Sequence, residues 1–118
     1  MTAGRRTPTD WTELHHDAGC IRLAVHGHLD VASAPGFRSV VAAADAPVVL
    51  VDLTGCTFLD AIGLGALVGA VRRQHLQGGR LVLLASPDSP VARLLASSGI
   101  DRLTPVGTDR LRELAAAS

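Results

Sequence analysis

The sequence has 118 residues, 47% of them hydrophobic and 19% charged, which is the composition of one globular domain and excludes a disordered chain. Eleven acidic residues balance eleven basic ones, all arginine, so no net charge directs the chain to nucleic acid or anionic lipid. The polar residues 1–10 lack the apolar region of a signal peptide, and the uncharged stretch 61–71 is shorter than the roughly 20 residues that span a bilayer. We therefore expect a soluble, cytoplasmic protein with no membrane insertion.

We expect residues 1–9 to form a flexible tail and residues 10–118 to form the single domain. The first two predicted strands are 11–16 and 21–28, because Ile, Leu and Val alternate with polar residues in the second of them. The turn residues 17–19 between the two strands predict an opening hairpin. Cys20 and Cys56 fall in or beside strands, and we interpret both as buried, reduced thiols.

Helical and extended patterns then alternate along the rest of the chain. Ser33 is a candidate helix cap, with Pro35 in the first turn and Phe37 and Val41 in the apolar stripe. Residues 48–53 are apolar on both faces except for Asp52, as in a buried central strand. The expected elements that follow are a loop at 54–60, a helix from Asp60 to about 77, a strand at 81–85, a helix that begins at Ser86 or Asp88 and ends near 98–99, an edge strand at 103–106 and a helix from Thr108 to 117.

Repeated strand–helix–strand units imply right-handed crossovers and parallel strands. The hairpin adds an antiparallel strand at one side. We therefore predict an α/β fold in which a mostly parallel, mixed β-sheet packs against four α-helices in a single domain.

Three glycines, Gly63, Gly65 and Gly69, open the helix after Asp60. Their GxGxxxG spacing differs from the dinucleotide fingerprint, no acidic residue follows about 20 positions on, and a loop is expected between strand and glycines. We interpret them as small residues that let the helix start approach the sheet or a partner.

The sequence does not assemble a catalytic or metal centre. It contains no GxSxG, HExxH or CxxC motif. His26 and His28 share a strand face, and His15 or His16 falls on the neighbouring strand, but the spacing is unlike that of zinc sites. The carboxylates near predicted strand ends are those of Asp30, Asp52 and Asp60, and turns and caps account for the first and last of these. We expect no enzyme, no metal and no cofactor.

Two segments together resemble a known family. GHLDVASAP at 27–35 is similar to the GELDxxxAP signature of STAS domains, and VLVDLTGCTFLDAIGLGAL at 49–67 is similar to their central DLSxVxFLDSSGLGxL segment. The segments 79–84 and 94–103 continue the resemblance, which extends from about residue 10 to the C-terminus.

The resemblance implies a STAS fold and, for a chain of this size, an anti-sigma factor antagonist. Such a protein binds an anti-sigma factor of the ATPase-kinase type, which then releases its sigma factor. The kinase phosphorylates a serine directly after the motif aspartate, and the phosphoprotein dissociates. A phosphate adds about −1.5 to −2 charges, which a helix N-terminus tolerates but which a tight interface beside Asp30 and Asp60 would repel.

The chain departs from the family at the position that is phosphorylated. Ala61 has no hydroxyl, Ile62 removes the second hydroxyl of the usual pair, and His28 replaces the glutamate of GELD. Three explanations are compatible with this: a permanently unphosphorylated antagonist, an engineered serine-to-alanine variant, or a protein that has left kinase control and serves another partner.

We expect the partner-binding surface to have an apolar centre and a charged rim. Its residues are Asp30, Asp60, Ala61, Ile62, Gly63, Leu64, Arg72 and Arg73. The alternatives are a STAS subunit of a stressosome-like, transporter or lipid-transport assembly, and a small-ligand sensor that binds nucleotide at the helix start. The oligomeric state stays open between a monomer and a weak dimer.

Overall fold

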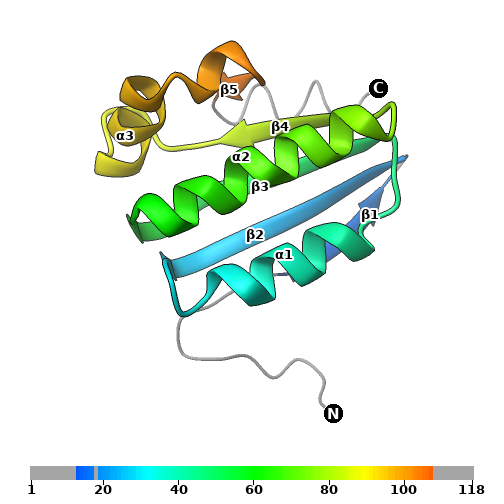
Figure 1. Ribbon diagram of the computed structural model, residues 1–118, viewed down its shortest axis with the longest axis horizontal. Helices are drawn as coiled ribbons and strands as arrows, with labels where there is room; N and C mark the ends of the chain where they lie inside the picture. Colours follow the sequence, from blue (N-terminus) through cyan, green and yellow to red (C-terminus); the bar gives the residue numbers. More distant parts are fainter. Residues whose placement is uncertain (1–12, 18, 108–118) are drawn as a thin grey trace.

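The structure, a computed structural model, describes the backbone of residues 13–17 and both backbone and side chains of residues 19–107. Five strands form one sheet in the order β1-β2-β3-β4-β5, in which β1 runs antiparallel to β2 and all other neighbours are parallel (Figure 1). The elements are β1 (Glu13–Asp17), β2 (Cys20–Leu29), α1 (Ala34–Ala43), β3 (Val48–Leu59), α2 (Ala61–Leu76), β4 (Arg80–Leu84), α3 (Pro90–Ser98), the 3₁₀ turn η1 (Ile100–Arg102) and β5 (Val106–Gly107).

The predicted α/β fold with its opening hairpin and parallel strands is confirmed. Neighbours in the sheet are also neighbours in the chain, so right-handed crossovers bring the described helices to the same face. Of the four expected helices, three lie in the described part, and the helix expected from Thr108 lies outside it, as does the tail 1–9.

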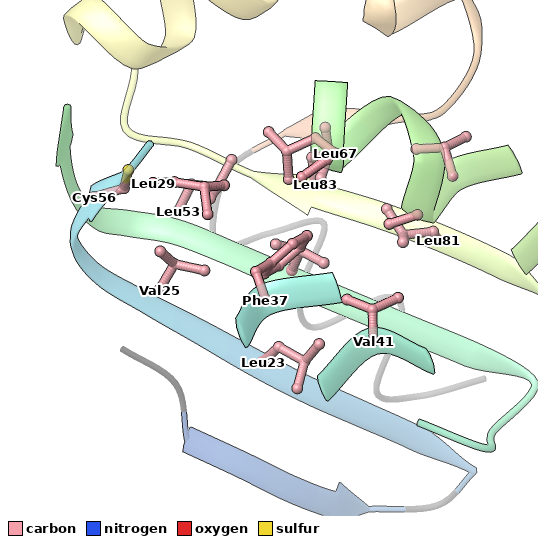
Figure 2. Packing of buried hydrophobic residues seen from close by; sticks show 14 of the residues in the cluster. Leu23, Val25, Leu29, Phe37, Val41, Leu53, Cys56, Leu67, Leu81 and Leu83 are labelled. Carbon is pink, nitrogen blue, oxygen red and sulfur yellow. The ribbon is translucent and has the colours of Figure 1, made fainter. Parts of the chain in front are cut away.

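The main core fills the space between this sheet face and the helices. Phe37 of α1, with none of its surface exposed, packs among leucines and valines from β2, β3 and β4 (Figure 2). A smaller buried cluster occupies the opposite face of the sheet and consists of Cys20, Val48, Leu50, Val82 and Leu84. The double-sided burial of β3 explains why its first half has hydrophobic residues at consecutive positions.

β3 is longer than predicted. The prediction of a loop at 54–60 is wrong, because β3 continues through Leu59 and stays paired with β2. Two register shifts, at which β3 has an extra residue relative to β2, interrupt the alternation of its side chains. Gly55 lies beside the first shift, where a Cβ atom would be 2.6 Å from Nδ1 of His26. Only Asp60 therefore separates the strand from α2.

The helix caps differ from expectation at two places. Ser33 occupies the N-cap position of α1, but its side chain makes no capping hydrogen bond. The cap of α3 is Ser89, whose Oγ accepts from the Ala92 N–H at 3.0 Å, and neither Ser86 nor Asp88 takes that role. The edge strand β5 begins at Val106 because the chain from Ile100 to Leu103 is taken up by η1 and its cap.

Candidate functional site

The carboxyl ends of β2 and β3 meet at one edge of the sheet, where the chain enters α1 and α2 (Figure 1). Asp60 joins these ends, and its predicted role as the N-cap of α2 is confirmed. Its Oδ1 accepts from the Gly63 N–H at 2.8 Å, and its Oδ2 accepts from the Val31 N–H at 3.3 Å. One carboxylate thus fastens the start of α2 to the segment that follows β2.

The turn between β2 and α1 is closed by its own side chains. Oδ1 of Asp30 accepts from the N–H groups of Ala32 and Ser33 at 3.0 and 3.2 Å. The Ser33 hydroxyl donates to the His28 carbonyl at 2.8 Å and accepts from the Asp30 N–H at 3.0 Å. Ser33 therefore turns back to the strand instead of capping the helix, which fixes Asp30 next to the Asp60 corner.

Gly63 permits the close approach of α2 to β2. A Cβ atom at this position would overlap the carbonyl group of Leu29 and lie 3.0 Å from Cδ1 of Leu59. The interpretation of the glycines as packing residues is therefore confirmed for Gly63. At Gly65 and Gly69 a Cβ atom would meet nothing within 4 Å, so for these two the approach to the sheet is wrong and the approach to a partner stays a prediction.

We define the strand-end surface at this edge by five exposed residues and two half-buried carboxylates: His28, Val31, Phe58, Ala61 and Ile62, with Asp30 and Asp60. It includes three large apolar side chains that face solvent, since Val31, Phe58 and Ile62 are 66%, 47% and 46% exposed. The rings of His28 and Phe58 lie 5.3 Å apart, and His28 Nδ1 is 3.7 Å from Asp30 Oδ2. Exposed apolar side chains that gather in this way are typical of protein–protein contacts.

The expected contact set lacked three residues of this surface, Val31, Phe58 and His28, the last of which the sequence analysis noted only as a departure from the GELD signature. The signal for Val31 was its place directly after Asp30 in a turn. The signal for Phe58 was its place in the β3 extension, opposite His28 in the register with β2. Recognising it required knowing that the segment before Asp60 is a strand.

The other expected contact residues occupy different places. Gly63 is buried and Leu64 is half-buried against the main core, so both support the surface from beneath. Arg72 and Arg73 are exposed near the end of α2. They follow Ala61 by 11 and 12 positions, about 17 Å along the helix at 1.5 Å per residue.

The helix start is poorly suited to a nucleotide phosphate. The Gly63 N–H, which a phosphate would need, already donates to Asp60, and the carboxylate would repel an anion. The structure has no loop between β3 and α2, which corrects our expectation. The GxGxxxG spacing of the glycines nevertheless differs from that of the dinucleotide fingerprint.

The histidines do not converge. Backbone pairing places His15 and His16 opposite Arg22 and Ile21, several residues from His26 along β2. Within residues 19–107, no three side chains of His, Cys, Asp or Glu come together as metal ligands would.

Asp52 lies within β3 and not at a strand end, which corrects its expected position. Its Oδ2 accepts from Nη2 of Arg22 at 2.6 Å, and its Oδ1 accepts from the N–H and hydroxyl of Thr54 at 2.9 and 2.6 Å. Burial raises the pKa of this carboxyl, but the hydrogen bonds from Thr54 and the Arg22 charge together outweigh burial and lower the pKa below its ordinary value. Burial also raises the pKa of the Cys56 thiol, which makes it a poor nucleophile.

No helix in the described part of the chain has the length and apolar character needed to cross a membrane.

The comparison with protein families identifies the chain. The family model described as Mlab, STAS domain matches residues 12–106, and the chain therefore belongs to the STAS domain family. The predicted STAS fold is confirmed.

Solved structures share this fold. An anti-sigma factor antagonist from Mycobacterium paratuberculosis is 21% identical with a TM-score of 0.75, over 87% of this chain and 90% of that one. The Bacillus protein SpoIIAA, an anti-sigma factor antagonist, is 20% identical in its unphosphorylated form, with a TM-score of 0.64 over 86% of this chain and 98% of that one. A sulfate transporter family protein from Wolinella succinogenes is 19% identical with a TM-score of 0.64, over 75% of this chain and 76% of that one.

Proposed function

We propose that this protein is an anti-sigma factor antagonist that acts by binding and not by catalysis. It binds an anti-sigma factor of the ATPase-kinase type in the cytoplasm and so frees a sigma factor. Membership of the STAS family and a fold shared with anti-sigma factor antagonists support the proposal. The observation that carries it is the exposed position of Ala61, directly after the capping Asp60, at the sheet edge where the side chains of Val31, Phe58 and Ile62 are also exposed.

The contact begins at the strand-end surface. Ala61 and Ile62 supply its centre together with Val31 and Phe58, and the carboxylates of Asp30 and Asp60 supply polar contacts at the rim. Gly63 and Leu64 hold this patch in place from below, and Arg72 and Arg73 extend the contact along α2. No cofactor takes part.

Position 61 cannot accept a phosphate in this chain. The side chain at position 61 projects into solvent at the first residue of α2, where a serine would be accessible to a kinase, but alanine offers no oxygen for phosphoryl transfer. An antagonist of this kind is permanently unphosphorylated at position 61 and stays competent to bind.

The test compares four baits in affinity capture from the source cell's lysate, with bound proteins identified by mass spectrometry: the natural chain, Ala61→Ser, Ala61→Asp and, as a matched control on the exposed surface of α3, Ala96→Asp. We expect the natural chain and the Ala96→Asp variant to retain an ATPase-type anti-sigma factor equally. Ala61→Asp places a charge in the apolar centre and should weaken binding about a hundredfold, which corresponds to about 2.7 kcal/mol.

Calorimetry with the recovered partner completes the test. With ATP present, the Ala61→Ser variant should lose affinity over time while the natural chain keeps it. Equal affinity of the Ala61→Asp variant and the natural chain would refute the assigned surface.

A second candidate function is that of a STAS subunit in a transporter, lipid-transport or stressosome-like assembly. It is favoured by the missing hydroxyl at Ala61, by the Mlab description of the family model and by the fold shared with a sulfate transporter family protein. Capture of transporter or scaffold subunits, without any ATPase-type anti-sigma factor, would select this function. Nucleotide titration by calorimetry tests the small-ligand alternative, which the occupied Gly63 N–H argues against.

A further inference from the structure

A groove of about 310 Å³ runs between α1 and α2, away from the strand-end surface. The two helices lie side by side over the same face of the sheet (Figure 1). Buried side chains form the floor of the groove, and exposed residues of both helices form its walls. The residues that matter for its chemistry are Arg38, Val41, Ala66, Gly69, Ala70 and Arg73.

Gly69 is a glycine that the fold does not require. It lies in the interior of α2, its φ is not positive, and a Cβ atom there would meet nothing within 4 Å. Glycine in a helix interior destabilises by about 1 kcal/mol relative to alanine. What the glycine provides is room at the groove, since Ala66 and Ala70 beside it are also small. A helix backbone can approach closely over such residues.

The two walls carry charge of a single sign. Arg38 stands on the α1 side and Arg73 on the α2 side, and both are exposed. The sequences of α1 and α2 also include Arg72 but no aspartate or glutamate, although acidic and basic residues are equal in number over the whole chain. Among residues 19–107 neither Arg38 nor Arg73 has an ion-pair partner. The groove is therefore apolar at its floor and cationic at both rims.

We propose that this groove docks an acidic amphipathic helix of a partner protein. Small apolar side chains of that helix sit over Gly69, Ala66 and Ala70, and its carboxylates form bidentate pairs with Arg38 and Arg73. A small-molecule site would place its polar groups inside the cavity, whereas here both guanidinium groups are at the rim of an open groove. Gly69 follows Ala61 by eight positions, about 12 Å along α2, so the floor of the groove lies away from the strand-end surface, and the two proposed contacts share only Arg73.

The test is a selection from a displayed library of helical peptides with one randomised face. Binders are compared on the natural chain, on Arg38→Glu and Arg73→Glu, and on Gly69→Leu, which fills the groove. Arg72→Glu is the matched control, because Arg72 is an exposed arginine of the same helix that does not line the groove. All these positions are exposed, and thermal melting confirms that the variants fold.

We expect the selected peptides to alternate Asp or Glu with Ala or Leu at helical spacing and to shift the backbone NMR signals of Gly69 and Ala70. Their affinity should fall about tenfold or more in the Arg38→Glu, Arg73→Glu and Gly69→Leu variants and less than about threefold in Arg72→Glu. Peptides without an acidic excess, equal losses at Arg72 and Arg73, or signals that move at Ala61 instead of Gly69 would each overturn the proposal. Displacement of the peptides from the groove by octanoate, a small amphiphilic anion, would also overturn the proposal. All of these measurements use only this protein and the peptides, so their outcome does not depend on whether the protein binds an anti-sigma factor.

Discussion

Replacing Gly63 with alanine should destabilise the protein strongly, although alanine is the better helix former. The new methyl group would overlap the backbone carbonyl of Leu29, well inside the roughly 3.5 Å at which heavy atoms pack. A backbone carbonyl inside a paired strand cannot rotate away as a side-chain end can. The first turn of α2 must therefore move away from β2.

The magnitude follows from what this movement breaks. Overpacking of a tight contact costs about 1–3 kcal/mol. The hydrogen bonds that the Asp60 carboxylate accepts, at 2.8 Å from Gly63 and 3.3 Å from Val31, contribute about 1 kcal/mol each. Better helix propensity returns about 1 kcal/mol. We expect the free energy of unfolding to fall by about 2–4 kcal/mol and Tm by about 8–16 °C.

Urea unfolding followed by far-ultraviolet circular dichroism measures this change, with Gly65→Ala and Gly69→Ala as matched controls. Because a methyl group meets nothing within 4 Å at either control position, both variants should gain up to about 1 kcal/mol. If Gly63→Ala is as stable as these controls, the close approach of α2 to β2 does not hold the structure in the way described.

Two further predictions concern carboxylates. Because the pKa of Asp52 is lower in the folded state than in the unfolded state, its ionised carboxylate stabilises the fold. This stabilisation is present above the pKa of the unfolded state, about 3.9, and is lost as the pH falls through the pKa of the folded state. The natural chain should therefore lose stability in acid more steeply than Asp52→Asn in acid-titrated urea unfolding, and an equal slope would contradict the Arg22 and Thr54 interactions. Asp60→Ala should lower the free energy of unfolding by about 1–2 kcal/mol through loss of the cap, and Asp60→Asn, which keeps an acceptor oxygen, by less; equal stability of Asp60→Ala and the natural chain would dismiss the cap.

The order of the elements could be predicted because each depends on local chemistry. An aspartate followed by a helical pattern caps that helix, and Asp60 does so. The end of β3 could not be predicted because Thr54 and Gly55 interrupt the alternation at a register shift that depends on pairing with β2. The cap of α3 was misplaced for a related reason, since three candidate residues follow β4 and only the backbone conformation selects Ser89.

The candidate site shows the same limit. Gly63, Gly65 and Gly69 look alike in the sequence, but the neighbouring β2 strand makes the first indispensable and leaves the other two unconstrained. Likewise, the spacing that places Arg73 after Ala61 does not indicate that α1 supplies a second arginine across a groove. The contact of Gly63 with β2 and the groove between Arg38 and Arg73 both depend on segments that are distant in the chain, so the local sequence does not predict them.

The double attachment of Asp60 has a consequence for how the protein responds to a partner. With one oxygen on α2 and the other on the backbone after β2, the corner beside Ala61 has little freedom to rearrange. Under the proposed function, a partner would meet a corner that is already held in place, so little conformational entropy would be lost on contact. At such a corner, we expect the chemistry of the exposed side chains, and not motion of the backbone, to decide which partner binds.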